Sequence, residues 1–193
     1  MKLAIFGGSF NPPHIGHLIV IECVRDLLQF DKVLFIPSAQ PPNKHDTSLA
    51  PAQSRLEMTR LAVKANSNLE VSDIDLHRQG ISYTIDTVNE LMERYPRSSL
   101  SLIIGADNLL EFETWKSPDE ILARAELIVM SRPGFDLHSA KGKYARSAKL
   151  VNVPQIGVSG TDFRRRVKFG RSIHYLIPSL VEDYITQKRL YRD

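Results

Sequence analysis

Apolar residues gather in six short runs along the chain, and polar residues separate them. Several of these runs are continuously apolar and do not alternate between apolar and polar residues. Strands that are covered on both faces, as in a parallel sheet, have this pattern. The pattern therefore predicts six strands, over residues 2–6, 32–37, 69–72, 100–105, 126–131 and 149–153.

Between the predicted strands, apolar residues return at helical spacing. Three such stretches predict helices over residues 16–29, 52–65 and 84–95. A further helix start is predicted at Ser117 and Pro118, where a capping serine precedes a first-turn proline and two carboxylates. Strands that alternate with helices indicate βαβ units. We therefore expect an α/β fold, a Rossmann-like, doubly wound, mostly parallel sheet of five or six strands with helices on both faces.

The pattern changes after the fifth predicted strand. Residues 133–148 show no periodicity and are interpreted as a surface loop. From Ser159 onward the pattern is helical, first as far as Gly170 and then from Pro178 to about Arg189. The sequence thus predicts a helical C-terminal end.

The length and composition are typical of one globular domain. With 193 residues and 42% hydrophobic content, the chain can bury a full core. We expect a single domain over residues 1–193, with a core over about 1–155 and a helical C-terminal part over about 156–193. No signal peptide or apolar run of membrane-spanning length is visible. We therefore expect a cytoplasmic protein without a membrane partner.

The charge and the cysteine count exclude further classes. Twenty-five basic and 22 acidic residues give a net charge of +3, which slightly favours small anionic ligands and does not indicate a nucleic-acid partner. Cys23 is the single cysteine, so an intramolecular disulfide is excluded and a cysteine-based zinc site is not expected. A homo-oligomer is compatible with the sequence, which does not determine the number of subunits.

The segment GGSFNPPHIGH, residues 7–17, directly follows the first predicted strand. In an open α/β sheet, ligands bind beyond the carboxyl ends of the strands. Gly7 and Gly8 let the backbone approach a ligand, the prolines stiffen the loop, and a helix start attracts anions. His14 and His17 lie three residues apart and can point the same way. A phosphate site fits this segment best. Two alternatives stay open, namely a metal site, for which no third ligand lies nearby, and a capped loop with incidental histidines.

Several motifs resemble one family. HIGH at residues 14–17 resembles the first motif of the nucleotidyltransferase superfamily, and VSGTDFR at 158–164 is similar to its ISSTxxR motif. Further segments resemble bacterial nicotinate-nucleotide adenylyltransferases, namely PSAQPPNK at 37–44, SYTIDT at 82–87, GADNLLEFETW at 105–115 and SRPG at 131–134. Together these motifs run through most of the chain. The chain departs from them at Gly160, where the family motif has serine, and at Asn43, where a histidine is frequent.

The resemblance implies transfer of AMP from ATP to the phosphate of nicotinate mononucleotide, which gives deamido-NAD and pyrophosphate. The implied catalytic residues are His14, His17, Lys44 and Arg164. The residues implied to bind ATP are Gly7, Gly8, Ser9, Phe10, Gly105, Asp107, Arg132, Ser159 and Thr161. Those implied to bind nicotinate mononucleotide are Ser82, Tyr83, Thr84 and Trp115. Mg²⁺ is expected to be held mainly by the ATP phosphates, so no metal site formed by the protein is expected.

Some of these residues also have a purely structural interpretation. Asp107 could cap the helix that follows it, and Trp115, the single tryptophan, could belong to the core. Lys44 could be an ordinary surface lysine. The basic residues that follow Arg164 are interpreted as a solvated helix face. The helix start at residues 82–84 offers N–H donors for a nicotinate carboxylate, which predicts a preference for the acid over the amide.

Two other functions are kept as alternatives. A related transferase that acts on phosphopantetheine would be shorter and would have no evident use for residues 82–87 or Trp115. A nucleotide-binding regulator without turnover would be indicated by the loss of His17 or Arg164, and both are present. A phosphate monoester is already a nucleophile, so we predict direct in-line attack on the ATP α-phosphate without a covalent enzyme intermediate.

Overall fold

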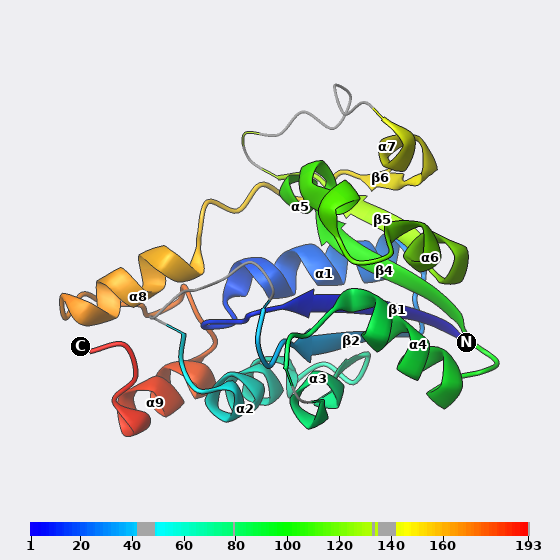
Figure 1. Ribbon diagram of the computed structural model, residues 1–193. Helices are drawn as coiled ribbons and strands as arrows, with labels where there is room; N and C mark the ends of the chain where they lie inside the picture. The colour runs from blue at the N-terminus through cyan, green and yellow to red at the C-terminus, as the bar shows by residue number, and fades with distance from the viewer. Residues whose placement is uncertain (42–48, 79, 133, 135–141, 193) are drawn as a thin grey trace.

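A computed structural model of the protein describes residues 1–41, 49–78, 80–132, 134 and 142–192. In these residues, six parallel strands form one sheet in the order β3-β2-β1-β4-β5-β6. Helices surround the sheet (Figure 1). This strand order is that of doubly wound Rossmann folds, in which the winding direction changes beside the first strand. The predicted fold class is confirmed.

The strands form close to their predicted limits. They are β1 Lys2–Gly8, β2 Lys32–Pro37, β3 Leu69–Val71, β4 Ser99–Gly105, β5 Glu126–Met130 and β6 Lys149–Val151. Phe6 of β1 is paired with Phe35 of β2 on one side and with Ile103 of β4 on the other. All three are buried. Burial of the central strands on both faces therefore explains why their sequences are continuously apolar.

The predicted helices also form, together with shorter ones. The described helices are α1 Ile15–Leu28, α2 Ala52–Val63, α3 Ile74–His77, α4 Thr84–Arg94, α5 Ala106–Glu111, the 3₁₀ helix η1 Phe112–Thr114, α6 Pro118–Arg124, α7 Lys143–Ser147, α8 Gly160–Lys168 and α9 Ser179–Lys188. The prediction that residues 133–148 form only a loop is wrong at α7. A helix of five residues is too short to show a helical period in its sequence.

Ser117 does not cap α6 in the predicted way. Its backbone is left-handed, with φ 51° and ψ 55°, and its side chain makes no capping hydrogen bond. A capping serine needs an extended backbone to place its hydroxyl over the first-turn N–H groups. Pro118 does occupy the first turn as predicted.

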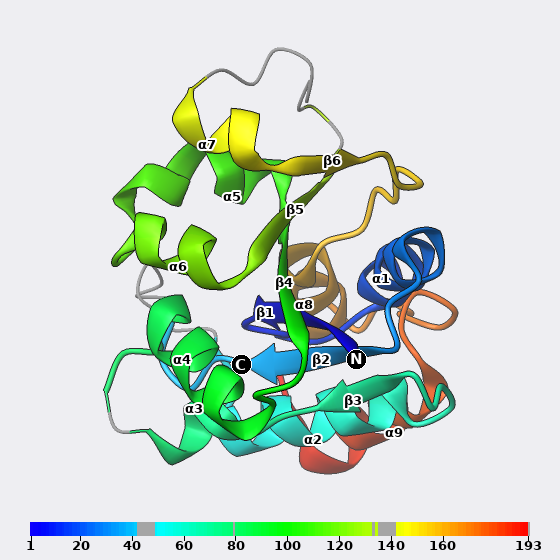
Figure 2. The same ribbon diagram turned by 90° about the vertical axis from the view of Figure 1, so that its right-hand side faces the viewer.

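A hydrophobic core lies on each face of the sheet. On one face, Val88 of α4 and Ile121 of α6 belong to the same buried cluster as Ile5 of β1. On the other face, Ile21 and Val24 of α1 pack in a second cluster. Figure 2 shows α1 and α4 on opposite sides of the sheet.

A third cluster places the C-terminal helices. Phe163 of α8 and Val181 of α9 pack with Met58 of α2. As a result, α8 and α9 lie at the end of the molecule toward which β1 points (Figure 1). None of the described helices is both long enough and apolar enough to cross a membrane.

Candidate active site

The loop between β1 and α1 is built around Phe10. This bulky residue has a left-handed backbone, with φ 44°, and its side chain is 2% exposed. Its ring packs against Phe6 and Phe35, at centroid distances of 5.6 and 5.5 Å. A Cβ atom on Gly8 would lie 3.2 Å from the Phe10 ring, so the glycine leaves room for it. Because left-handed backbone is strained for a bulky residue, this packing helps to hold the loop in place. The Phe10 ring is therefore part of the core, and only its backbone can meet a ligand.

His14 and His17 stack on each other at the start of α1. Their ring centroids are 3.6 Å apart and their planes are tilted by 20°. The backbone N–H of His14 donates to Nδ1 of His17 over 3.1 Å, so a neutral His17 carries its proton on Nε2. Burial, followed by the nearby charge of Arg132, lowers the pKa of His14 to about 4. His14 is therefore a neutral imidazole at neutral pH.

The described residues contain no group of three or more His, Cys, Asp or Glu side chains placed to bind a metal ion. His14 and His17 stack face to face, so their nitrogens do not converge on one point between them. Mg²⁺ moreover prefers oxygen ligands to imidazole nitrogen. The two histidines are thus better suited to contact phosphate oxygens than to hold this cation.

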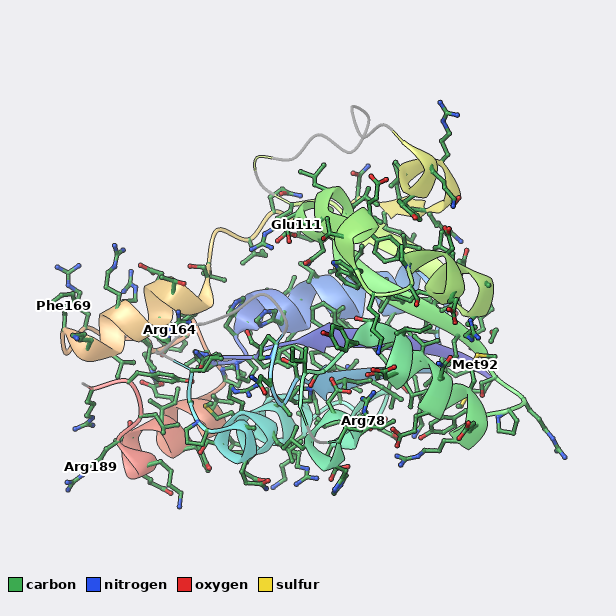
Figure 3. All side chains as sticks on the ribbon, viewed as in Figure 1. Arg78, Met92, Glu111, Arg164, Phe169 and Arg189 are labelled. Carbon is green, nitrogen blue, oxygen red and sulfur yellow. The ribbon has the colours of Figure 1, made fainter. Side chains whose placement is uncertain are left out.

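The start of α8 is joined to the loop after β1. Oγ of Ser159 accepts a hydrogen bond from the N–H of Asp162 over 3.2 Å and caps the helix. Arg164 donates from Nη1 to the carbonyl oxygen of Asn11 over 2.9 Å and from Nη2 to Oγ1 of Thr161 over 3.3 Å. Figure 3 shows Arg164 on α8, at the same end of the molecule as Arg189 at the end of α9. The two motifs that resemble HIGH and ISSTxxR are therefore neighbours in space.

The glycine at position 160 has a packing reason. A Cβ atom there would lie 3.0 Å from the carbonyl oxygen of Asn11 and 3.3 Å from Nη1 of Arg164. Contacts this short would require one of these groups to move. The departure from the family motif thus lets α8 lie close against the loop.

A second group of predicted residues surrounds the carboxyl end of β4. Asp107 forms an ion pair with Arg132, which follows β5. Asp107 does not cap α5, because it lies within the first turn and Gly105 occupies the cap position. A Cβ atom on Gly105 would lie 2.5 Å from Oδ1 of Asp107, so a larger residue would require this carboxylate to turn away. The second group is linked to the first because the charge of Arg132 acts on His14.

A third group lies at the start of α4. Oγ of Ser82 is buried and accepts from the N–H groups of Ala39 and Gln40 over 3.1 and 3.4 Å. The Ser82 side chain thus anchors the segment after β2. No described residue accepts a hydrogen bond from the backbone N–H of Tyr83 or Thr84. These two N–H groups can therefore receive an anion.

Trp115 and Lys116 lie close to the third group. Trp115 is half-buried, and its ring centroid is 5.0 Å from that of Phe112. Nζ of Lys116 lies 4.6 Å from the ring centroid of Tyr83 and 3.2 Å from Oδ2 of Asp86. Trp115 therefore contacts the core, as its structural interpretation predicted, and is not fully buried, as stacking on a ligand requires.

Residues 5–166 match a model of the cytidylyltransferase-like family. The chain belongs to this family. It is 42% identical to the "Probable nicotinate-nucleotide adenylyltransferase" of Salinibacter ruber, over 100% of this chain and 98% of that protein. It is 41% identical to the protein of the same name from Thermus thermophilus, over 100% of both chains. These relatives confirm the family that the sequence motifs predicted.

The fold of this family member agrees with a solved structure. The nicotinic acid mononucleotide adenylyltransferase of Plasmodium falciparum complexed with NaAD superposes with a TM-score of 0.81 at 20% identity, over 98% of this chain and 97% of that chain. At this low identity, the likeness shows that the two proteins share a fold.

The structure places a buried arginine that the sequence did not predict beside the site. Arg55 of α2 is 1% exposed and donates to the carbonyl oxygens of Ser9, Ser38, Ala39 and Ala50 over 2.7–3.0 Å. It thereby joins the loop after β1 to the segment after β2. Burial lowers the pKa of Arg55, but its usual value is so high that it stays charged. The available signal was its position, because Arg55, Met58 and Ala62 recur on the buried side of α2.

One predicted catalytic residue lies outside the described residues. Lys44, with Asn43 before it, belongs to residues 42–48. The other predicted residues form the three groups described above, at the carboxyl ends of β1, β2, β4 and β5. This is the edge of a doubly wound sheet where ligands bind.

Proposed function

We propose that the protein transfers the adenylyl group of ATP to nicotinate mononucleotide, giving deamido-NAD and pyrophosphate in NAD biosynthesis. The observation that carries this proposal is the joining of the stacked pair His14–His17 to Arg164 through Asn11, at the carboxyl end of β1. These groups are neutral or positive hydrogen-bond donors, as a site for two phosphate-bearing substrates needs. The names of the relatives support the same reaction.

The proposed reaction is a single displacement. A phosphate oxygen of nicotinate mononucleotide bonds to the α-phosphorus of ATP while the bond from that phosphorus to the β-phosphate bridging oxygen breaks. Pyrophosphate leaves, and no covalent enzyme intermediate forms. The protein then has two tasks, which are to hold two anions in line and to stabilise the charge that develops between them.

Each group of residues has a role in this reaction. His17 donates from Nε2 to a phosphate oxygen, His14 stays neutral beside it, and Arg164 supplies positive charge. The backbone from Gly7 to Phe10 approaches the ATP phosphates. Ser159 caps α8 and Thr161 accepts from Arg164, and both are proposed to lie beside the ATP phosphates. Lys44 is proposed as a second cation for the phosphates.

The residues after β4 and β5 are proposed to bind the nucleoside part of ATP. Gly105 leaves the space that Asp107 occupies, and the Asp107 carboxylate can accept hydrogen bonds from ribose hydroxyls. Arg132 orients Asp107 and adds charge. Mg²⁺ is proposed to be bound through the phosphate oxygens of ATP, where it neutralises the leaving pyrophosphate.

The start of α4 is proposed to select nicotinate. The N–H groups of Tyr83 and Thr84 can donate to both oxygens of its carboxylate, and the positive end of the helix dipole favours the charge. The exposed part of Trp115 can stack on the pyridine ring. Ser82 sets the position of this segment through its hydrogen bonds to residues 39 and 40.

The test uses ATP labelled at the α-phosphate. The purified protein is mixed with nicotinate mononucleotide, its amide or phosphopantetheine, and both pyrophosphate and the labelled product are measured. We expect release of pyrophosphate and a labelled dinucleotide with the nicotinate acceptor, less with the amide and none with phosphopantetheine. Binding of ATP without pyrophosphate release from any acceptor would favour a regulator. Label that stays on denatured protein would contradict direct transfer.

A further inference from the structure

The segment after α9 returns to the loop between β1 and α1. Arg189 ends α9 with left-handed backbone, φ 53°, and the N–H of Leu190 donates to the carbonyl oxygen of Ile185 over 3.1 Å. Tyr191 is also left-handed, with φ 63°. Leu190 and Tyr191 both pack against the third cluster, between α2, α8 and α9. These turns direct the Tyr191 side chain toward the site and not into solvent.

The Tyr191 side chain ends on Asn11. Its hydroxyl donates to Oδ1 of Asn11 over 2.7 Å, which joins two residues 180 positions apart. The same Oδ1 accepts from the backbone N–H of Ala50 over 3.0 Å. Asn11 is 4% exposed. A buried amide oxygen that receives two donors from different segments is held in one orientation.

Asn11 also contacts a predicted catalytic residue. Its backbone carbonyl accepts from Nη1 of Arg164 over 2.9 Å. Asn11 lies one residue after the strained backbone of Phe10 and three residues before His14. A shift of Asn11 would therefore move the hydrogen-bond partner of Arg164 and the approach to both histidines at once.

Tyr191 is a neutral donor in this network. Burial raises the pKa of its hydroxyl well above the usual value, although the charges of Arg164 and Arg55 act in the opposite direction. The hydroxyl therefore keeps its proton at neutral pH. It can hold Asn11 without adding a charge beside the phosphates.

We propose that Tyr191 is a positioning residue, which through Asn11 holds the loop between β1 and α1 in the arrangement that adenylyl transfer needs. The proposal rests on the function proposed above. Tyr191 acts at a distance. Its hydroxyl donates to Asn11, and the loop and Arg164 are the groups that contact the substrates.

The first test removes only the hydroxyl. Tyr191→Phe keeps the ring in the third cluster, and Tyr184→Phe, on α9 beside the same cluster, is the matched control. Tyr175→Phe, at a residue 85% exposed, is a second control. We expect Tyr191→Phe to lower kcat by about 2- to 12-fold, the worth of one hydrogen bond, with the KM values for both substrates nearly unchanged. Neither control variant should lower kcat.

A double-mutant cycle tests the route through Asn11. In an Asn11→Ala background, the further change Tyr191→Phe should lower kcat no more, because the acceptor is already gone. Equal effects of Tyr191→Phe in both backgrounds would overturn the proposal.

Hydrogen exchange of the ligand-free protein tests positioning without any activity. The backbone amides of residues 7–17 should exchange about 2- to 12-fold faster in Tyr191→Phe than in the wild type and in the two controls. Unchanged exchange overturns the proposal, and so does faster exchange with an unchanged kcat. If the wild type transfers no adenylyl group, the proposed function fails, and the exchange rates alone then decide whether Tyr191 positions the loop.

Discussion

Thr84 begins α4 with a backbone N–H that no described residue accepts. At this residue the backbone matters more for the proposed function than the side chain does. Its neighbour Tyr83 has extended backbone, with φ −89° and ψ 136°, which is the conformation that a following proline requires. The first helical position also tolerates proline well. One N–H donor can therefore be removed at Thr84 without disturbing the helix.

We predict that Thr84→Pro narrows the ratio of kcat/KM between nicotinate mononucleotide and its amide. A charge-assisted hydrogen bond of about 1.5–3 kcal/mol corresponds to a loss of about 10- to 100-fold for the acid. The amide should lose less, because it gains no charge-assisted bond from this donor. Steady-state kinetics with both substrates measure the ratio.

Thr84→Val is the matched control, because it removes the hydroxyl and keeps the N–H. It should leave the ratio nearly unchanged. A Thr84→Pro enzyme that is folded and has the wild-type ratio would mean that the carboxylate binds elsewhere. A smaller acid-to-amide ratio of kcat/KM in both variants would instead assign the effect to the threonine side chain.

Among the elements, α2 makes contacts with several segments around the site. Its Arg55 donates four hydrogen bonds to backbone carbonyls of three separate segments. Oγ of Ser82 accepts from the N–H groups of Ala39 and Gln40. The segment after β2 therefore has both carbonyl oxygens and N–H groups bonded to buried side chains. Helix α2 is itself fixed by Met58 in the cluster that contains α8 and α9. The helix thus connects the C-terminal part of the chain to two loops of the site.

We predict that Arg55→Met lowers the free energy of unfolding by about 3–5 kcal/mol, because buried carbonyl oxygens lose charged donors. Arg55→Lys keeps the charge but has fewer donors in a different geometry, so it should recover only part of this loss. Arg60→Met, on the same helix with its side chain 44% exposed, is the control and should change stability little. Urea unfolding of the three variants measures these differences. A loss in Arg55→Met no larger than in the control would contradict the role given to these hydrogen bonds.

For the whole molecule, His14 makes stability depend on pH. Folding lowers the pKa of this histidine from 6.5 to about 4. Between these pH values the unfolded chain binds more protons than the folded protein, so stability falls as the pH falls. The full effect is about 3 kcal/mol, present above the unfolded pKa and lost by the time the pH reaches the folded pKa.

We predict that His14→Gln removes this part of the pH dependence. Between about pH 7 and pH 4, the free energy of unfolding of the wild type should fall by about 3 kcal/mol more than that of the variant. The comparison is between the slopes of unfolding free energy against pH, so a change in stability that is the same at every pH does not affect it. Denaturant unfolding at several pH values measures these slopes. His77→Gln, at a histidine whose side chain is 75% exposed, should keep the wild-type slope. Parallel curves for the wild type and His14→Gln would show that His14 is not held neutral by the fold.

The strands and the long helices could be predicted because their apolar residues repeat locally. The helices α3 and α7 could not, since each is too short to display a period. The family motifs located most of the candidate site, whose individual roles stay predictions. Asn11 and Tyr191 could not be predicted, because their hydrogen bonds join distant parts of the chain and leave no local pattern. Arg55 left only one signal, its position on the buried side of α2. The single-domain organisation over residues 1–193 also stays a prediction.

The bonds that hold this site join residues far apart in the chain, 153 positions for Arg164 and Asn11 and 180 for Tyr191 and Asn11. The sheet is non-local as well, since Lys2 of β1 pairs with Ser99 of β4. Closing such long loops loses chain entropy before any contact compensates for it, and chains of high contact order fold slowly. The loop between β1 and α1 gains its hydrogen bonds to Arg164 and Tyr191 only when α8 and the segment after α9 have docked. During synthesis or refolding, the chain would therefore pass through a stage in which the sheet is formed but the site cannot yet carry out the proposed reaction. Activity would be the last property that the chain acquires.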